Sequence, residues 1–258
     1  MLPRTALEQM THRFVVRRRL PAPFNAARIY VSSEGGLRYL RPSIGSVDPT
    51  LLRLAAEMVR PGDVIWDIGA NLGLFSFAAS ALAGPNGHVL AVEPDALLVR
   101  MLRRSAAANH RQAPVEVLPV AVADDLGVAR FHIARRNRST SHLDGFGTSQ
   151  TGGIRATELV PTVTLDWLAA RFPMPNVVKI DVEAAEVKVL TGGAAVLCTL
   201  PRIICEVAGH NAAAAGDLLA AHGYTLYDGQ QSATRRTPVA VAPPETLAIN
   251  DGRSVPRR

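Results

Sequence analysis

The sequence predicts an α/β protein with a three-layer, Rossmann-like sheet that is mainly parallel and has an antiparallel last strand. From Asp63 onward, short apolar runs alternate with amphipathic stretches, the pattern of strands and helices in a parallel sheet covered on both faces. Several apolar runs end in polar residues, as expected at the ligand-binding edge of such a sheet. Two final runs, residues 224–228 and 246–249, are expected to close the sheet as a pair.

Turn-forming residues bound the expected elements. A helix over residues 49–59 carries an apolar stripe and stops at Pro61-Gly62. A second helix, residues 71–83, ends at the Gly-Pro-Asn-Gly run that follows it. Further helices are expected at 95–109, 165–171, 184–197 and 212–222, and strands at 27–31, 64–67, 88–92, 115–122, 129–133, 177–182 and 202–207. Residues 135–153 are rich in Asn, Ser, Thr and Gly and predict a long loop.

The chain of 258 residues fits one α/β domain with short extensions. Residues 1–48 are expected to form a basic N-terminal extension or cap, residues 49–250 the domain, and residues 251–258 a disordered tail. No apolar run is long enough to span a bilayer, and the N-terminus lacks the pattern of a signal peptide. These features predict a cytoplasmic protein without a membrane span, with Cys198 and Cys205 as reduced core thiols.

The net charge of +6 raises the question of nucleic-acid binding. The arginines are scattered in small clusters, and aromatic residues make up only 5% of the chain, so few side chains are available to stack on bases. This pattern disfavours nucleic acid as a partner, although an RNA-binding or RNA-modifying protein is kept as an alternative. The sequence carries no signature of a particular oligomeric state.

The strand over residues 64–67 ends in Asp67, and Gly69, Asn71 and Gly73 follow before a helix begins. Glycines at such a turn let the backbone approach a ligand closely. The next strand ends in Glu93, about 20 residues after the glycines, where a carboxylate accepts hydrogen bonds from ribose hydroxyls. These residues predict a nucleoside-containing cofactor.

Two cofactor classes fit this layout, a nicotinamide dinucleotide and S-adenosylmethionine. The dinucleotide motif requires G-x-G-x-x-G and a helix end that accepts a pyrophosphate. Here Asp67 would repel a phosphate, whereas it suits a ligand with a cationic amino group and a sulfonium. The chemistry favours S-adenosylmethionine, with an NAD-dependent oxidoreductase as the alternative. Backbone amides of residues 121–123 or the side chain of Asp124 are expected at the adenine.

Five blocks together resemble the FkbM family of methyltransferases. The blocks are residues 64–73 (VIWDIGANLG), 89–94 (VLAVEP), 163–168 (VTLDWL), 178–186 (VKIDVEAAE) and 206–207 (EV). The resemblance implies the class I methyltransferase fold for residues 49–250 and S-adenosylmethionine as the methyl donor. It also implies O-methylation of a hydroxyl on a sugar, a glycan or a small-molecule secondary metabolite. The family pattern D-x-E-G-x-E differs here in one position, Ala184 in place of glycine, which would strain the turn if its φ is positive.

The fourth block supplies the candidates for chemistry. Strand alternation places Lys179 and Asp181 on one face at the end of a strand, with Glu183 at the following turn. Asp181 is the leading candidate for the base or orienting group of methyl transfer, and Lys179 is expected to hold it or the acceptor hydroxyls. An alternative is that Asp181, Glu183 and Glu206 bind Mg²⁺. His142, in a polar loop, is a further candidate for a base or an acceptor contact.

Overall fold

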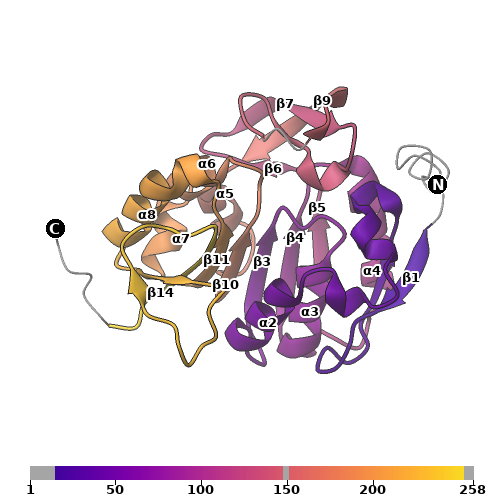
Figure 1. Ribbon diagram of the computed structural model, residues 1–258, viewed down its shortest axis with the longest axis horizontal. Helices are drawn as coiled ribbons and strands as arrows, with labels where there is room; N and C mark the ends of the chain where they lie inside the picture. The colour runs from indigo at the N-terminus through magenta and orange to yellow at the C-terminus, as the bar shows by residue number, and fades with distance from the viewer. Residues whose placement is uncertain (1–14, 148–150, 253–258) are drawn as a thin grey trace.

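The computed structural model describes residues 15–147 and 151–252, and an eight-stranded sheet lies at its centre (Figure 1). The strand order is β13-β12-β14-β11-β10-β3-β4-β5. The five strands from β11 to β5 run parallel, while β14, the last strand of the chain, is antiparallel to both of its neighbours. The strands are β3 (Val64–Ile68), β4 (His88–Val92), β5 (Val115–Leu118), β10 (Val177–Ile180), β11 (Arg202–Glu206), β12 (Thr225–Asp228), β13 (Pro238–Val239) and β14 (Glu245–Ile249). The predicted fold is confirmed, including the pairing of β12 with β14.

Helices cover both faces of this sheet, because successive residues of each central strand point to opposite sides. On β3, Ile65 packs in one hydrophobic core while the neighbouring Trp66 packs in the other. The first core also contains residues of α2 (Pro49–Met58), α3 (Leu74–Ala83) and α4 (Ala96–Ala107). The second contains residues of α5 (Leu165–Ala169), α6 (Glu186–Thr191), α7 (Ala194–Cys198) and α8 (Ala212–Ala221).

A second, four-stranded sheet of order β6-β9-β7-β8 lies above the ends of the parallel strands (Figure 1). Its strands are β6 (Ala121–Val122), β7 (Gly127–Ala134), β8 (His142–Leu143) and β9 (Ile154–Val163). The single strand expected over residues 115–122 is therefore wrong. Pro119 interrupts it, since proline has no N–H to donate, and the chain leaves β5 and enters the second sheet as β6.

Two expected helices begin or break differently from the prediction. The helix expected from residue 71 begins at Leu74, because Asn71 and Gly73 both have positive φ. The helix expected over 184–197 is split into α6 and α7 at Gly192-Gly193. A Cβ at Gly192 would lie 2.4 Å from the carbonyl oxygen of Ala123, so the close packing of these segments requires glycine there.

The described part of the N-terminal segment packs against the domain. It contains β1 (Val16–Arg19) paired with β2 (Arg28–Val31), followed by three short 3₁₀ helices: η1 (Ser33–Gly35), η2 (Leu37–Leu40) and η3 (Ile44–Ser46). Ile29, Tyr39 and Ile44 are buried in the same core as α2 and α3. The segment thereby brings residues 38–48 to the upper edge of the sheet.

At the other end of the chain, part of the expected tail is ordered. Asp251 accepts a hydrogen bond from Thr225 at 3.0 Å and another from Tyr227, whereas residues 253–258 lie outside the described residues. Among the helices that the structure describes, none is both long and apolar enough to cross a lipid bilayer.

Candidate functional site

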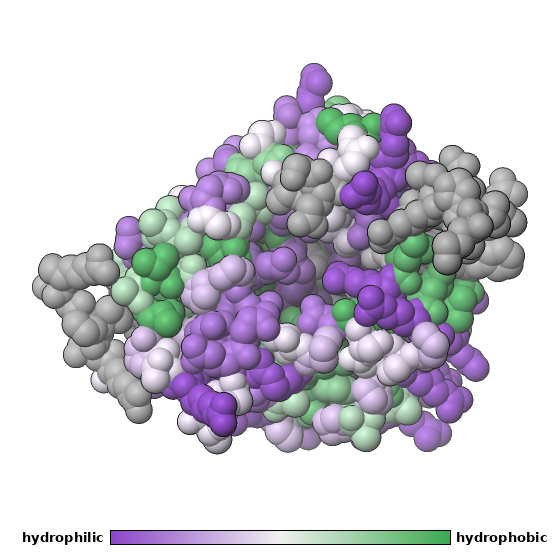
Figure 2. All heavy atoms as spheres, in the orientation of Figure 1, coloured by the Kyte–Doolittle hydropathy of each residue, from purple (hydrophilic) through white to green (hydrophobic). Residues whose placement is uncertain are grey.

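Two adjoining cavities lie at the carboxyl ends of the parallel strands. The glycine-turn cavity follows β3 and β4 and is bordered by Gly69, Glu93 and the strand β6. The carboxylate cavity, of about 370 Å³, lies beside it over β10, β11 and β14. Both are bordered by the same four residues, Asn71, Ser139, Asp181 and Glu183. Figure 2 shows hydrophilic residues gathered around a hollow near the middle of this face.

The turn after β3 is built so that the main chain itself forms the wall of the glycine-turn cavity. Gly69 has φ +77°, and a Cβ there would lie 1.8 Å from the carbonyl oxygen of Asp181. Its N–H donates to Val92 at 2.9 Å, which ties the turn to β4. Asn71, at φ +52°, and Gly73, at φ +84°, continue the left-handed turn up to the first residue of α3. Only glycine fits at position 69, which explains its place in the motif.

Glu93 lies at the base of this cavity and is almost fully buried. Its two carboxylate oxygens accept hydrogen bonds from the backbone N–H groups of Asn71, at 2.8 Å, and of Asp95, at 2.9 Å. Burial, together with the Asp95 carboxylate, raises the pKa of Glu93 to about 7 in spite of these donors. Each oxygen keeps a second lone pair for a hydroxyl donor.

The remainder of the glycine-turn cavity is apolar on one side and polar on the other. Val120, Val122 and Phe131 form the apolar wall. On the polar side, the buried Oδ1 of Asn71 has no hydrogen-bond partner within the described chain. A flat aromatic group fits the apolar wall, and a polar ligand atom would satisfy Asn71.

Asp124 lies outside both cavities, contrary to its expected contact with the adenine. Its carboxylate pairs with Lys188 at 3.0 Å on the surface. The N–H of Ala123 is also occupied, because it donates to Val163 at 2.9 Å. Residues 120–122 border the cavity in their place.

Lys179 joins the two cavities through a buried ion-pair network. Its Nζ lies 3.1 Å from Asp181 Oδ2 and 3.3 Å from Asp67 Oδ1, and it donates to the carbonyl of Gly69 at 2.8 Å. Asp67 is fully buried, accepts a hydrogen bond from Ser76, and borders neither cavity. Burial alone would lower the pKa of Lys179, but the Asp181 and Asp67 carboxylates outweigh it and raise the pKa. Lys179 therefore stays protonated and is held in place by its partners. Asp67 contacts Lys179 and does not face a ligand cavity.

Glu183 borders both cavities from a strained turn after β10. Its φ is +52°, and that of Ala184, where the family pattern has glycine, is +77°. Glu186 holds the turn by accepting a hydrogen bond from the N–H of Ala184 at 2.8 Å, while Asn211 donates to the carbonyl of Ala184 at 2.8 Å. Burial and the nearby carboxylates raise the pKa of Glu183 to about 8.

Ala184→Gly is expected to increase the free energy of unfolding by about 0.5–1 kcal/mol. A left-handed backbone costs about 1–2 kcal/mol for a residue with a Cβ, and part of this gain is offset by the greater freedom of glycine in the unfolded chain. Urea unfolding measures the change. Ala185→Gly is the matched control, because Ala185 has an ordinary φ of −98° and its replacement should destabilise. If both variants lower the free energy of unfolding equally, the backbone at Ala184 is not strained.

The carboxylate cavity contains residues that the sequence did not indicate. Arg38, Tyr39 and Asp48 come from the N-terminal segment, and Glu245 comes from β14. Glu206, at the end of β11, lies directly opposite Glu245 in the strand register. Only the fold brings these distant segments together, so no local motif could have identified Arg38, Tyr39, Asp48 or Glu245, whereas Glu206 was a candidate from the sequence.

His142 borders the glycine-turn cavity, not the carboxylate cavity. It is buried on β8, its Nδ1 lies 3.1 Å from the carbonyl oxygen of Thr140, and its ring contacts His132 edge to face at 5.6 Å. This location places it beside the apolar wall, in the cavity that Asp181 and Glu183 also border.

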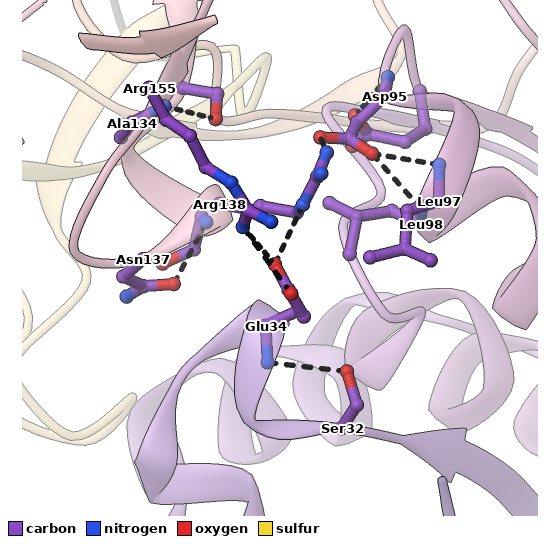
Figure 3. A network of polar contacts seen from close by, with 12 residues as sticks. Ser32, Glu34, Asp95, Leu97, Leu98, Ala134, Asn137, Arg138 and Arg155 are labelled. Atoms are coloured by element: carbon purple, nitrogen blue, oxygen red, sulfur yellow. Dashed lines mark hydrogen bonds and ion pairs between the residues drawn. The ribbon is translucent and has the colours of Figure 1, made fainter. Parts of the chain in front are cut away.

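Arg138, which also borders the glycine-turn cavity, joins three segments of the chain (Figure 3). Its guanidinium lies 2.9 Å from Glu34 of the N-terminal segment and 2.6 Å from Asp95. Asp95 caps α4 through the N–H of Leu97, and Arg155 of β9 lies 3.0 Å from Glu34. The network fastens the second sheet and the N-terminal segment beside Glu93.

The structure does not arrange Asp181, Glu183 and Glu206 as a metal site. Across residues 15–147 and 151–252, no group of three or more His, Cys, Asp or Glu side chains is placed to hold a metal ion.

The sequence and the fold of this chain are similar to those of known methyltransferases. The methyltransferase FkbM domain model matches residues 67–226. The chain is 30% identical over 187 residues to the hexuronic acid methyltransferase AglP of Haloferax volcanii, covering 70% of each chain. It is 33% identical over 200 residues to the 31-O-demethyl-FK506 methyltransferase FkbM of Streptomyces tacrolimicus, covering 67% of this chain and 74% of that relative. Among solved structures, precorrin-6y C5,15-methyltransferase of Geobacter metallireducens has a TM-score of 0.41 at 16% identity, covering 81% and 89% of the two chains.

The parallel sheet with its antiparallel last strand, the glycine turn and the matched domain define the class of protein, an S-adenosylmethionine-dependent methyltransferase of the class I fold. The matched region spans most of the chain and includes the end of β3, the glycine turn and β10. The chain belongs to the FkbM methyltransferase family, which confirms the resemblance seen in the five blocks.

Proposed function

We propose that this protein transfers a methyl group from S-adenosylmethionine to a hydroxyl of a sugar, a glycan or a secondary metabolite. The observation that carries the proposal is the junction of two cavities at Asp181 and Glu183. One cavity has the glycine turn and the buried acid suited to a nucleoside, and the other has polar walls suited to a hydroxylated acceptor. The relatives named for a hexuronic acid and for 31-O-demethyl-FK506 support acceptors of this kind.

The residues of the glycine-turn cavity fit the cofactor. Glu93 would accept hydrogen bonds from the ribose hydroxyls, and the apolar wall of Val120, Val122 and Phe131 would hold the adenine. Asn71 Oδ1, which has no partner within the described residues, would accept a hydrogen bond from the cofactor. When bound, S-adenosylmethionine supplies an electrophilic methyl group on a cationic sulfonium.

The carboxylate cavity would orient the acceptor hydroxyl. Asp181 borders both cavities, and its carboxylate is held by Lys179 at 3.1 Å. A carboxylate in this position accepts the hydroxyl proton and fixes the direction of the oxygen lone pair. Glu183 is a poorer base near neutral pH, because its raised pKa of about 8 keeps it protonated. We therefore assign to Asp181 the role of accepting the hydroxyl proton. Glu183 is assigned a hydrogen bond to the acceptor.

Titration by calorimetry tests the choice of cofactor. S-Adenosylmethionine and S-adenosylhomocysteine are expected to bind, and NAD⁺ is expected not to bind, because the turn has Gly69-x-x-x-Gly73 in place of the G-x-G-x-x-G motif that accepts a pyrophosphate. Transfer of labelled methyl groups from the cofactor to hydroxylated acceptors tests the reaction. Tight binding of NAD⁺ without binding of S-adenosylmethionine would refute the proposal.

The affinity for S-adenosylhomocysteine is expected to rise about 10-fold from pH 6 to pH 8. The pKa of Glu93 is raised to about 7, so its ionised form, which accepts the ribose hydrogen bonds, becomes dominant only above that pH. This ligand is chosen because it lacks the sulfonium charge that other carboxylates would attract. Glu93→Gln should bind weakly at both pH values and lose this dependence, whereas pH-independent binding by the wild type would contradict the role.

A further inference from the structure

The carboxylate cavity is bordered by more carboxylates than cations, and three of the carboxylates lie away from the glycine-turn cavity, where the donor is proposed to bind. Five carboxylates and two cations border the carboxylate cavity; the carboxylates are Asp48, Asp181, Glu183, Glu206 and Glu245, and the cations are Arg38 and Lys179. Lys179 is held by Asp67, Asp181 and the Gly69 carbonyl. Within the described chain, Arg38 forms no ion pair with any of the five and packs over the Tyr39 ring at 5.7 Å.

Glu206 and Glu245 form the clearest part of this excess. They lie directly opposite each other on β11 and β14, where like charges destabilise a sheet. Neither side chain has a hydrogen bond or ion pair to another described residue, although both border the cavity. The Asp181 carboxylate raises the pKa of Glu206 to about 7, and burial and Glu206 raise the pKa of Glu245 to about 8. A cation bound between them would lower both pKa values and be held by the ionised carboxylates.

Tyr39 is an independent sign of a ligand at the same place. Its side chain is only 3% exposed and borders the carboxylate cavity, with Arg38, Lys179, Asp181 and Asp48 as its charged neighbours. The hydroxyl makes no hydrogen bond within the part of the chain that the structure describes. Most polar groups of buried side chains have a hydrogen-bond partner, so a polar group bound in the cavity is expected to complete this one.

The two cavities divide the carboxylates into two sets. Asp181 and Glu183 border both cavities and so face the cationic donor. Asp48, Glu206 and Glu245 border the carboxylate cavity alone, and Asp48 is partly engaged as the cap of α2, accepting from Leu51 at 2.8 Å. Glu206 and Glu245 are therefore the carboxylates of this cavity that are open to an acceptor and lie away from the glycine-turn cavity of the donor.

We propose that the acceptor carries a cationic amino group near the hydroxyl that is methylated, as an amino sugar does, and that Glu206 and Glu245 bind that group. This inference rests on the proposed function. It separates the protein from its relative that is named for a hexuronic acid, because an anionic acceptor would be repelled by Glu206 and Glu245.

Binding of three matched sugars tests the inference. The methyl glycosides of glucosamine, glucose and glucuronic acid are titrated by NMR into protein saturated with S-adenosylhomocysteine. The glucosaminide is expected to bind at least about 10-fold more tightly than the glucoside, and the glucuronide more weakly than either. In the double variant Glu206→Gln/Glu245→Gln this order should be lost, while the affinity for S-adenosylhomocysteine stays within about 2-fold. Glu158→Gln, on the exposed surface of β9, is the control and should keep the order.

Each contrary outcome has a distinct meaning. If the glucosaminide binds no more tightly than the glucoside, the inference is overturned while the proposed function stands. Strong binding of Mg²⁺ that displaces the glucosaminide and is lost in the double variant would assign the cluster to a metal and also overturn it. A protein that fails to bind S-adenosylhomocysteine fails the proposed function, and the sugars are then compared on the ligand-free protein with the same criterion.

Discussion

Asp181→Asn is expected to slow methyl transfer at least about 100-fold while cofactor binding remains measurable. Asparagine retains an oxygen that can accept from Lys179, so the ion-pair network loses a charge but keeps its shape. It cannot accept the proton of the acceptor hydroxyl, and general-base catalysis typically contributes 10²–10⁴-fold. Single-turnover transfer of a labelled methyl group measures the rate, and calorimetry measures the dissociation constant of S-adenosylhomocysteine.

Asp124→Asn provides the matched control for this change. Asp124 pairs with Lys188 at the surface and borders neither cavity, so its replacement should leave the transfer rate within about 2-fold. Full transfer by Asp181→Asn would remove Asp181 from the role of base. Loss of both transfer and cofactor binding would instead make it a residue of the cofactor site.

Lys179→Met is expected to lower the free energy of unfolding by about 3–5 kcal/mol, the largest effect on stability considered for this protein. Methionine fills similar space but leaves the Asp67 and Asp181 carboxylates without their cation, and Asp67 is fully buried. Urea unfolding at constant pH measures the loss. A second replacement, Asp67→Asn, removes one of the two uncompensated charges and should recover part of the stability.

Lys188 is the natural control, because Lys179 and Lys188 are the chain's two lysines. Lys188 forms a half-exposed pair with Asp124 at 3.0 Å, so Lys188→Met should cost no more than about 1 kcal/mol. If Lys179→Met and Lys188→Met lower the free energy of unfolding equally, burial of the Lys179 network does not strengthen its ion pairs.

The sequence allowed the sheet and the glycine turn to be predicted because both depend on local patterns. Apolar runs defined the strands, and Gly69 and Glu93 were recognised by their spacing from the end of β3. Ala184 has a positive φ, which is the condition under which the sequence predicts strain in this turn. Asp67 was recognised as part of the motif, but its burial behind Lys179 became visible only in three dimensions.

The carboxylate cavity could not be predicted from the sequence in the same way. Tyr39, Glu206 and Glu245 meet only after the N-terminal segment packs on α2 and β14 inserts between β11 and β12. The contact expected from Asp124 depended on where the chain goes after β5, and Pro119 directs it into the second sheet. Contacts between distant segments decide these positions, and local patterns do not record them.

The carboxylate cavity takes part of its wall from outside the matched family region, residues 67–226. Arg38, Tyr39 and Asp48 precede that region, and Glu245 follows it, whereas Gly69 and Glu93 lie within it. Part of the wall proposed to bind the acceptor is thus encoded outside the family domain, while Asp181, Glu183 and Glu206 lie within it. A chimera that exchanges residues 38–51 and 230–245 with those of another family member should change its preferred acceptor while keeping its methyl donor. Replacement of these two segments is therefore a route to new methylated products, both in evolution and in protein engineering.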